Sequence, residues 1–239
     1  MNEVVIVKHE KKWISGYAVI LSLTLLITCW SSHAVTVFSE NAPIKRRNTI
    51  VIDPGHGGID GGATSCTGIL ESRFNLEISL RLNDLFHFLG YQTKMIRTED
   101  ISVYREGDTI ARKKISDLKE RVRMVGETEN PVLLSIHQNY FPDGQYSGAQ
   151  VFYAKTQNSQ SLAEAVQQRF VKCLNPGSRR QEKKSSGIYL MEHISCPAIL
   201  IECGFLSNPE EEAKLRDKNY QQKLCCVIAS AVSSSLSNT

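Results

Sequence analysis

The sequence predicts an α/β fold in which a mainly parallel central sheet carries helices on both faces. The first observation behind this prediction is that short β-rich runs alternate with longer helical runs from residue 48 onward, as is typical of parallel sheets with crossover helices. The second is size, because the chain has 239 residues and 41% of them are hydrophobic. A chain of this length and composition suits one domain with a full core and a short appendage.

Six short segments are predicted as strands, because they are rich in apolar and β-branched residues and are bounded by turn-forming residues. In chain order they cover residues 49–53, 91–98, 131–137, 148–154, 187–191 and 197–202. Ligands of such sheets bind beside the carboxyl ends of the strands. Residues that end or follow these segments are therefore candidates for a functional site.

Five longer segments are predicted as helices. They cover residues 71–89, 112–128, 159–174, 209–217 and 219–236. Part of the first segment, residues 74–82, also alternates apolar and polar residues like a strand, but Phe74, Ile78 and Leu82 share one helical face. The length of the segment and Gly90 after it, a residue typical of helix ends, favour the helix.

The appendage is the N-terminus, where an uncharged apolar run, residues 13–30, follows a lysine cluster. Residues 1–34 are predicted as a signal peptide or a membrane anchor, and the length of the run leaves both open. "SHA" resembles a cleavage site and "LITC" resembles an imperfect lipoprotein box. Basic residues before the run place everything after it outside the cytoplasm, so we expect an exported protein that is anchored or secreted. Residues 35–47 are predicted as a linker.

Charge and cysteine content exclude several classes of function. The formal charge of +3 arises from 28 basic and 25 acidic residues without a large basic block, so nucleic acid is not expected as a partner. Seven cysteines occur without a CxxC motif. This spacing predicts neither a disulfide framework nor a cysteine-based zinc site.

One histidine closely follows a predicted strand and another ends one. His56 stands between glycines in "DPGHGG", and His137 ends the apolar run "LLSIH". The glycine spacing fits neither a dinucleotide fingerprint nor a P-loop. His56 is therefore interpreted as a metal ligand, a catalytic base or a structural histidine in a tight turn, and the same choice applies to His137. If the two strands are adjacent and parallel, both imidazoles lie at one rim of the sheet.

Two glutamates complete the candidate site. Two imidazoles and one carboxylate form a common catalytic zinc site with a position left for water, and Glu71, at the start of the first helix, is the candidate carboxylate. Favourable interaction with the helix dipole is the alternative explanation for Glu71. Glu202 ends the apolar run "AILI", where burial should raise its pKa and suit it to act as a general base.

Four motifs resemble the zinc-dependent N-acetylmuramoyl-L-alanine amidase 3 family. In chain order they are "DPGHGGIDGGA", "ESRFNLEISLRL", "SIHQN" and "IECGFLSNPEE". The resemblance covers residues 48–236 and implies one zinc amidase catalytic domain, with Zn²⁺ held by His56, Glu71 and His137 and with Glu202 as the catalytic residue. It implies hydrolysis of the amide between N-acetylmuramic acid and the L-alanine of peptidoglycan stem peptides.

Three further segments resemble the germination-specific, spore-cortex branch of that family. They are "REGDTIARKKISDLKERVRMV", "SGAQVFY" and "GIYLMEHISCPA". This resemblance implies spore-cortex peptidoglycan as the substrate, a role in forming muramic-δ-lactam before germination, and action in the forespore intermembrane space. An accessory sporulation protein and the membrane, reached through the N-terminal segment, are the partners it suggests.

Two alternatives and three side chains remain open at this stage. Cys203 follows Glu202 and raises the alternative of a thiolate nucleophile paired with His137, although alternation along a strand should turn it away from the face of Glu202. A non-catalytic, membrane-anchored protein that binds peptidoglycan or a partner is the other alternative. Ser135 and Asn139 could orient His137. Arg97 could meet a carboxylate of a peptide, but we expect it to be solvated.

Overall fold

A computed structural model describes residues 48–237. The predicted signal peptide or anchor and the predicted linker lie outside the described residues. Within residues 48–237, no helix has the length and apolar character needed to cross a membrane.

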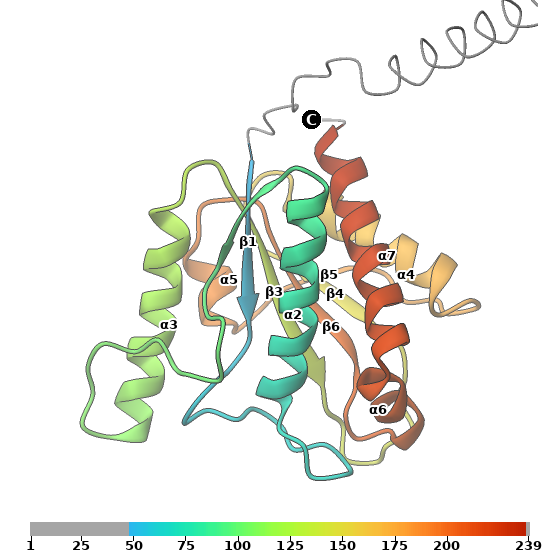
Figure 1. The fold of residues 1–239 in the computed structure, drawn as a ribbon, viewed down its shortest axis with the longest axis horizontal. Helices are drawn as coiled ribbons and strands as arrows, with labels where there is room; N and C mark the ends of the chain where they lie inside the picture. The colour runs from blue at the N-terminus through green and yellow to red at the C-terminus, as the bar shows by residue number, and fades with distance from the viewer. Residues whose placement is uncertain (1–47, 238–239) are drawn as a thin grey trace, which may run out of the picture. The chain divides into compact units, whose positions relative to one another are not determined.

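The described residues contain a sheet of six strands in the order β2-β1-β3-β6-β4-β5. Five helices and one short helical segment, α5, surround it (Figure 1). All neighbouring strands are parallel except β4 and β6, which are antiparallel. The strands are β1 (Thr49–Pro54), β2 (Gln92–Met95), β3 (Pro131–Asn139), β4 (Gln150–Tyr153), β5 (Lys183–Lys184) and β6 (Ala198–Phe205). The α/β prediction with a mainly parallel sheet is confirmed.

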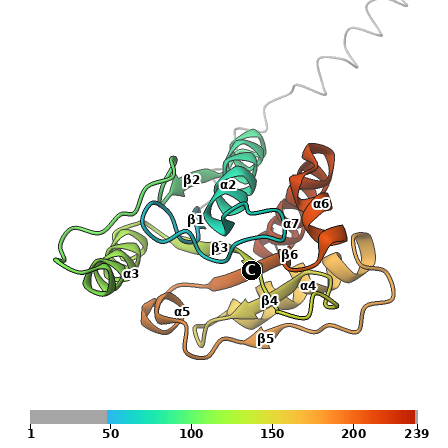
Figure 2. The same cartoon turned by 90° about the horizontal axis from the view of Figure 1, so that it is seen from below.

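Helices cover both faces of the sheet, as predicted. The helices are α2 (Glu71–Phe88), α3 (Ile110–Gly126), α4 (Ser159–Cys173), α5 (Tyr189–His193), α6 (Pro209–Arg216) and α7 (Lys218–Ser237). Viewed along the sheet, α2 and α7 lie on one side of it and α3 and α5 on the other (Figure 2). Each side encloses its own group of buried apolar residues.

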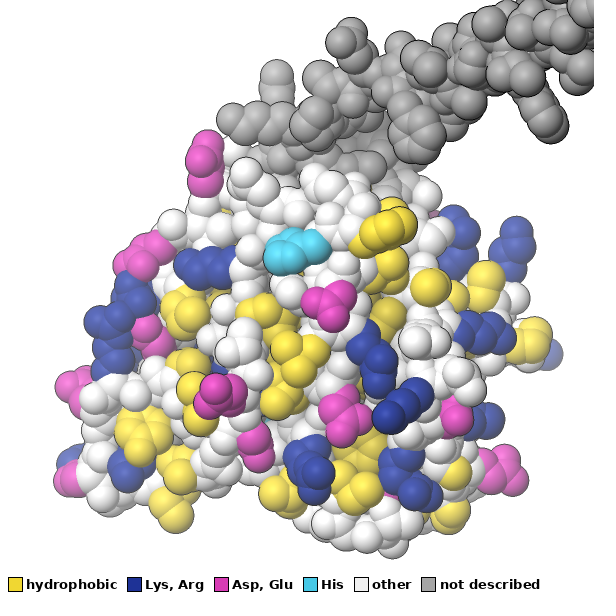
Figure 3. Space-filling view, in the orientation of Figure 1, with side chains coloured by type: hydrophobic (Ala, Val, Ile, Leu, Met, Phe, Trp, Pro, Cys, Tyr) yellow, Lys and Arg dark blue, Asp and Glu magenta, His cyan; other side chains and the backbone are white. Residues whose placement is uncertain are grey.

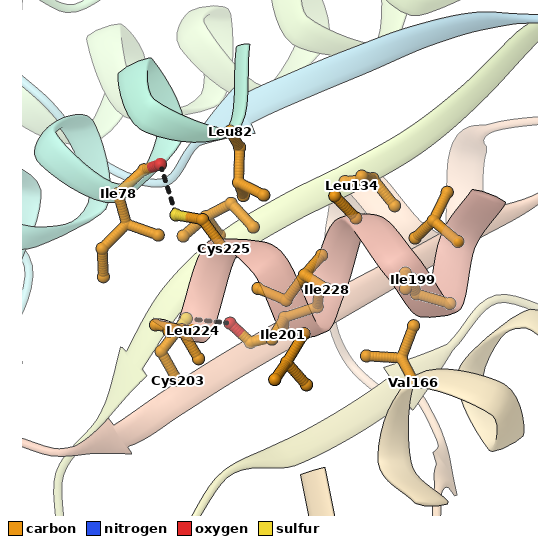
Figure 4. Close-up of a cluster of buried hydrophobic side chains, with 14 of the residues drawn as sticks. Ile78, Leu82, Leu134, Val166, Ile199, Ile201, Cys203, Leu224, Cys225 and Ile228 are labelled. Atoms are coloured by element: carbon orange, nitrogen blue, oxygen red, sulfur yellow. Dashed lines mark hydrogen bonds between the residues drawn. The ribbon is translucent and has the colours of Figure 1, made fainter. Parts of the chain in front are cut away.

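The larger core lies between the sheet and α2, α4 and α7. Leu224 and Ile228 of α7 pack on Ile199 and Ile201 of β6, while α2 and α4 contribute side chains from either side (Figure 4). The residues named here are almost fully excluded from solvent. Because burial of an aliphatic side chain contributes about 1.5–3 kcal/mol, this core fixes β6 in the middle of the sheet.

Helix starts are specified by local sequence. Thr109 precedes α3, and its side chain accepts a hydrogen bond from the Arg112 backbone N–H at 3.2 Å. Asn208 precedes α6 and accepts hydrogen bonds from the N–H groups of the next turn, while Pro209 occupies the first helical position. Both arrangements are common N-terminal caps, which satisfy backbone donors that have no partner within the helix.

One strand prediction is wrong. Residues 187–191 were expected to form a strand, but residues Tyr189–His193 form α5. Leu190 and Met191 are adjacent in sequence and both are buried in the smaller core, which is incompatible with the strict alternation of a strand. Short apolar runs do not distinguish strands from buried helical turns. The two-residue strand β5 was not predicted, because it consists of two exposed lysines and so has no apolar pattern in the sequence.

The visible surface in Figure 3 carries acidic, basic and apolar side chains interspersed with one another. This matches the nearly even numbers of acidic and basic residues in the sequence.

Candidate metal centre

Three of the predicted site residues meet at the carboxyl edge of the sheet. His56 follows β1, Glu71 begins α2 and His137 lies on β3, and one potential ligand atom from each falls within 4.8 Å of the others. Glu71 joins the two histidines, with Oε2 3.3 Å from Nε2 of His56 and Oε1 3.0 Å from Nδ1 of His137. The histidines therefore share one rim, as the adjacent parallel strands β1 and β3 require.

Glycines leave the space that these side chains occupy. A Cβ atom on Gly55 would lie 2.2 Å from the His137 ring, and one on Gly62 would lie 2.6 Å from Oε2 of Glu71. Gly62 also has a φ of +70°, which disfavours residues with a side chain. The glycine-rich segment thus lets the backbone wrap closely around the imidazole and carboxylate groups.

Neighbouring polar groups orient the His56 and Glu71 side chains. Oδ2 of Asp60 lies 2.9 Å from Nδ1 of His56. Asn75, one turn after Glu71 on α2, donates to Oε1 of Glu71 at 3.2 Å, and the backbone N–H of Ala63 donates to Oε2 at 3.0 Å. Such partners fix the rotamers of ligating side chains and tune their basicity.

Two buried arginines hold the backbone around His56. Arg97 donates to the carbonyl oxygens of Pro54 and Gly55, each at 2.9 Å, and is only 3% exposed. The expectation that Arg97 is solvated is therefore wrong, because its guanidinium satisfies backbone carbonyls inside the protein. Arg121, on α3, donates to the carbonyl of His56 at 2.7 Å. His56 adopts a φ of 60°, so its backbone is held in an uncommon conformation.

Arg121 is itself paired with a buried carboxylate. Oδ1 of Asp53, at the end of β1, lies 2.5 Å from Nη1 of Arg121, and the hydroxyl of Ser135 donates to Oδ2 of Asp53 at 2.6 Å. Burial acts to raise the pKa of Asp53, but the charge of Arg121 and the Ser135 hydrogen bond outweigh it and hold that pKa below its usual range. Ser135 thus supports Asp53 rather than contacting His137.

Glu202 lies directly beside the cluster. In the parallel pair of β3 and β6, Glu202 is the register partner of His137. Its Oε2 is buried and has no hydrogen-bond partner among the described residues. Burial, assisted by the negative charge of Glu71, raises the pKa of Glu202 to about 7, although the nearby histidines act in the opposite direction. A carboxyl group with this pKa is suited to accept and return a proton near neutral pH.

Cys203 points into the larger core, away from Glu202. It is 1% exposed, and its Sγ faces the carbonyl of Ile201 at 3.8 Å (Figure 4). Burial raises the pKa of its thiol well above the usual value. A thiolate paired with His137, the alternative that the sequence left open, is incompatible with this position.

The charges of the cluster are strongly coupled. Burial lowers the pKa of His56, but hydrogen bonds and charges from Asp60 and Glu71 outweigh it and raise the value to about 9. Burial would raise the pKa of Glu71, yet the two histidines outweigh burial and hold that pKa below its usual range. The imidazole of His56 therefore stands in the negative field of Asp60 and Glu71, and the carboxylate of Glu71 remains ionised.

Sequence reasoning missed the residues that support the cluster. Asn75 stands four residues after Glu71, so its place on the same helical face could have been read from the sequence. Asp60 lies inside the quoted glycine motif, but nothing in the motif shows which neighbour it contacts. The contacts of Arg97 and Arg121 with the loop depend on the packing of β2 and α3 against β1 and have no local sequence signal.

The donor set fits a zinc ion. Two imidazole nitrogens and one carboxylate oxygen, held by hydrogen bonds from a surrounding shell, are the usual ligands of a catalytic zinc that keeps one position for water or substrate. No cysteine thiolate is among them, and the absence of a large set of oxygen donors disfavours calcium and magnesium.

Comparisons with known proteins agree with this geometry. The germination-specific N-acetylmuramoyl-L-alanine amidase of Bacillus subtilis (strain 168) is 34% identical over 223 residues, which are 92% of this chain and 93% of that protein. The N-acetylmuramoyl-L-alanine amidase LytC of the same organism is 30% identical over 183 residues, covering 75% of this chain and 34% of LytC.

Solved structures show the same fold. The CwlD amidase from Clostridioides difficile, solved in complex with the GerS lipoprotein, superimposes with a TM-score of 0.77 at 35% identity, covering 80% of this chain and 99% of that chain. The family model described as N-acetylmuramoyl-L-alanine amidase matches residues 50–234, which include His56, Glu71, His137 and Glu202. The family match and the similarity in sequence and fold agree with one another. The chain therefore belongs to the N-acetylmuramoyl-L-alanine amidase family.

Proposed function

We propose that this chain is a zinc-dependent amidase that hydrolyses the amide between N-acetylmuramic acid and the L-alanine of peptidoglycan stem peptides. One observation carries the proposal: a cluster of two imidazoles and a carboxylate lies beside Glu202, whose Oε2 is buried without a hydrogen-bond partner. A carboxylate in that setting reduces stability, and groups of this kind are concentrated at functional sites. Residues 48–236 are proposed as the catalytic domain.

His56, Glu71 and His137 are the residues that would hold zinc. A zinc ion supplies Lewis acidity toward the scissile carbonyl and lowers the pKa of water toward about 7. Asp60 and Asn75 hold the His56 and Glu71 side chains in position. Arg97 and Arg121 hold the backbone that carries His56.

Glu202 performs the proton transfers. With its pKa raised to about 7, it is a stronger base than an ordinary carboxylate and accepts a proton from the attacking water. The protonated carboxyl group then donates that proton to the nitrogen of L-alanine as the amide C–N bond breaks. The products are the free lactyl carboxylate of the muramic acid and a peptide with a free amino terminus.

The proposed site of action is the spore cortex. Support comes from the similarity to a germination-specific amidase of Bacillus subtilis over nearly the full length of both proteins. Removal of the peptide from muramic acid is the chemical step that must precede lactam formation, since the lactyl carboxyl group has to be released first. We therefore include muramic-δ-lactam formation, and action in the forespore intermembrane space after export or membrane anchoring, in the proposal.

An accessory sporulation protein is also part of the proposal. The support for it is the C. difficile CwlD structure, which was solved with the GerS lipoprotein bound. The test of this function therefore uses the full-length chain, with and without an extract of sporulating cells.

The test combines metal content with digestion. Zinc bound to the purified full-length chain is quantified. Release of peptides that begin with L-alanine from spore peptidoglycan is measured with and without zinc, a chelator and the extract, and the extract alone is the control. We expect release that requires zinc. Bound zinc with no release under any of these conditions would contradict the proposed reaction.

Variants separate the two roles. Glu202→Gln should retain zinc and lose peptide release by about 10²–10⁴-fold, the usual contribution of a general base, while His137→Ala should lose both. Glu129→Gln, at an exposed position, and His87→Ala, an exposed residue of α2 outside the cluster, are matched controls that should change neither. If Glu202→Gln released peptide at the wild-type rate, the assignment of the base would be wrong.

A further inference from the structure

Arg180 presents an uncompensated positive charge next to the candidate site. Its Nη1 donates to Oε1 of Gln150 at 3.4 Å, its Nη2 donates to the carbonyl of Ser147 at 3.1 Å, and its Cζ lies 5.3 Å from the centroid of the Phe205 ring. None of these partners is acidic. Among residues 48–237, no carboxylate oxygen lies within 4.0 Å of the Arg180 guanidinium.

Both of its side-chain partners are neighbours of the site. Gln150 is the register partner of Glu202 in the antiparallel pair of β4 and β6. Phe205 is the register partner of Asn139, which lies two residues beyond His137 on β3. The Arg180 guanidinium therefore lies at the carboxyl edge of the sheet, on the β4 side of Glu202.

Aromatic rings continue the surface beyond Phe205. The Tyr146 ring stacks on Phe205 with centroids 6.1 Å apart, and Phe141 meets Tyr146 edge to face at 4.6 Å. Phe141 and Tyr146 are 45% and 42% exposed, so both rings reach the surface of the molecule. Stacking on an aromatic face and two neutral acceptors hold the guanidinium in a fixed orientation without neutralising it.

The remaining N–H groups of Arg180 are available to a ligand. A guanidinium has five N–H donors arranged in a planar fork, and the described contacts occupy two of them. The two buried arginines near the site are different: Arg97 is bound to backbone carbonyls, and Arg121 is bound to a backbone carbonyl and to the carboxylate of Asp53.

We propose that Arg180 is an anion subsite that binds a carboxylate of the substrate's peptide. The proposal rests on the amidase function proposed above, and it assigns the β4 side of Glu202 to the leaving peptide. The chemistry of the substrate favours the peptide over the glycan, because N-acetylated sugars are neutral and the lactyl carboxyl group is consumed in the scissile amide. A stem peptide, in contrast, continues past L-alanine into residues with free carboxylates.

The first test measures binding without turnover. Two peptides that begin with L-alanine, one with free carboxylates and one with every carboxylate converted to an amide, are titrated by calorimetry into the zinc-loaded full-length chain. We expect wild type to bind the acidic peptide about tenfold more tightly than the amide peptide, as for a hydrogen bond to a charged group. Arg180→Gln should lose this preference and leave the affinity for the amide peptide unchanged.

Two variants make the result specific. Arg180→Lys keeps the charge but not the fork, so it should retain part of the preference. Arg179→Gln removes one positive charge from the exposed neighbouring residue. This variant should retain the full preference for the acidic peptide. The proposal would be overturned if wild type bound the two peptides with equal affinity. It would also be overturned if Arg180→Gln lowered the affinity for both peptides equally, since a purely structural role would not depend on the carboxylates.

Kinetics separate this proposal from the amidase function. With muropeptide substrates, Arg180→Gln should raise KM about tenfold for acidic stem peptides and leave kcat and the KM of amidated ones unchanged. A wild-type chain that binds the acidic peptide selectively but releases none would contradict the amidase and leave the subsite supported. A chain that hydrolyses acidic and amidated substrates with the same KM would support the amidase and refute the subsite.

Discussion

At residue 202 the chain buries a carboxyl oxygen that has no hydrogen-bond partner in the described structure. In the unfolded chain the pKa of such a group is near 4.5, and in the fold burial raises it to about 7. The energetic cost of the buried charge is absent below pH 4.5, grows between pH 4.5 and 7, and is complete above pH 7.

This gives a prediction for the metal-free protein. Glu202→Gln should be more stable than wild type above pH 7, by about 3 kcal/mol, and the difference should disappear near pH 4.5. Denaturant unfolding in the presence of a chelator measures it, with Glu129→Gln as the control at an exposed position. A stability difference that stays constant from pH 4 to 8 would show that titration of residue 202 is not the cause.

Gly55 gives a second prediction at the scale of one residue. A Cβ there would lie 2.2 Å from two atoms of the His137 ring, so Gly55→Ala must displace the ring. We expect an affinity for zinc about 10- to 100-fold lower, in the range found when groups that position a ligand are changed. Competition with a chromogenic chelator measures the affinity, and Gly126→Ala, where an added Cβ meets nothing within 4 Å, should leave it unchanged.

At the scale of the elements, α3 and β1 are joined through the pair of Asp53 and Arg121. Both side chains are almost fully buried, and the pair lies directly behind the carbonyl of His56. Removal of one member of a buried pair leaves the other charge without compensation and is strongly destabilising.

Asp53→Asn is therefore expected to reduce stability at pH 7 by about 3–5 kcal/mol. Because the pKa of Asp53 is held below its usual range in the fold, its contribution is present above the pKa of the unfolded chain, near 4, and is lost as the pH falls further. The difference between wild type and Asp53→Asn should thus shrink below pH 4. Asp84→Asn, on the exposed face of α2, is the control, and a difference that grows in acid would contradict the pairing.

At the scale of the whole molecule, both cores belong to one sheet. The larger core uses one face of β1, β3, β4 and β6, and the smaller core uses the other face of the same strands. Neither core can form without strands that also build the other, so the described residues should behave as one cooperative unit.

A polypeptide of residues 48–239 is therefore predicted to fold on its own. Its thermal unfolding should be a single transition, identical when followed by far-UV and near-UV circular dichroism, and its zinc affinity should equal that of the full-length chain. Separate transitions, or loss of zinc binding on removal of residues 1–47, would refute the proposed domain boundary.

The fold and the centre of the site were largely predictable from sequence, because they depend on local patterns. Apolar runs placed β1, β3 and β6, and the positions of His56, His137 and Glu202 at their ends follow from strand geometry. The adjacency of β1 and β3 itself was an assumption, and it is confirmed.

The sequence-based predictions failed where contacts between residues distant in the chain determine secondary structure or burial. The segment at residues 187–191 has no local feature that separates a strand from α5, whose two buried residues pack beside α3. Arg97 looks like a surface residue in sequence, and its burial depends on carbonyls about 40 positions earlier in the chain. Arg180 likewise acquires its position from Phe205 and Gln150, which belong to different strands.

The strand order has a consequence for the timing of activity. Of the six strands in the described chain, β6 is synthesised last, yet it lies between β3 and β4 near the middle of the sheet. A nascent chain that has reached residue 197 already carries His56, Glu71 and His137 but not Glu202. With the role proposed for Glu202, hydrolytic competence is therefore expected only in about the last sixth of translation, when the closing strand joins the two halves of the sheet, and a product truncated before residue 202 is expected to be inert.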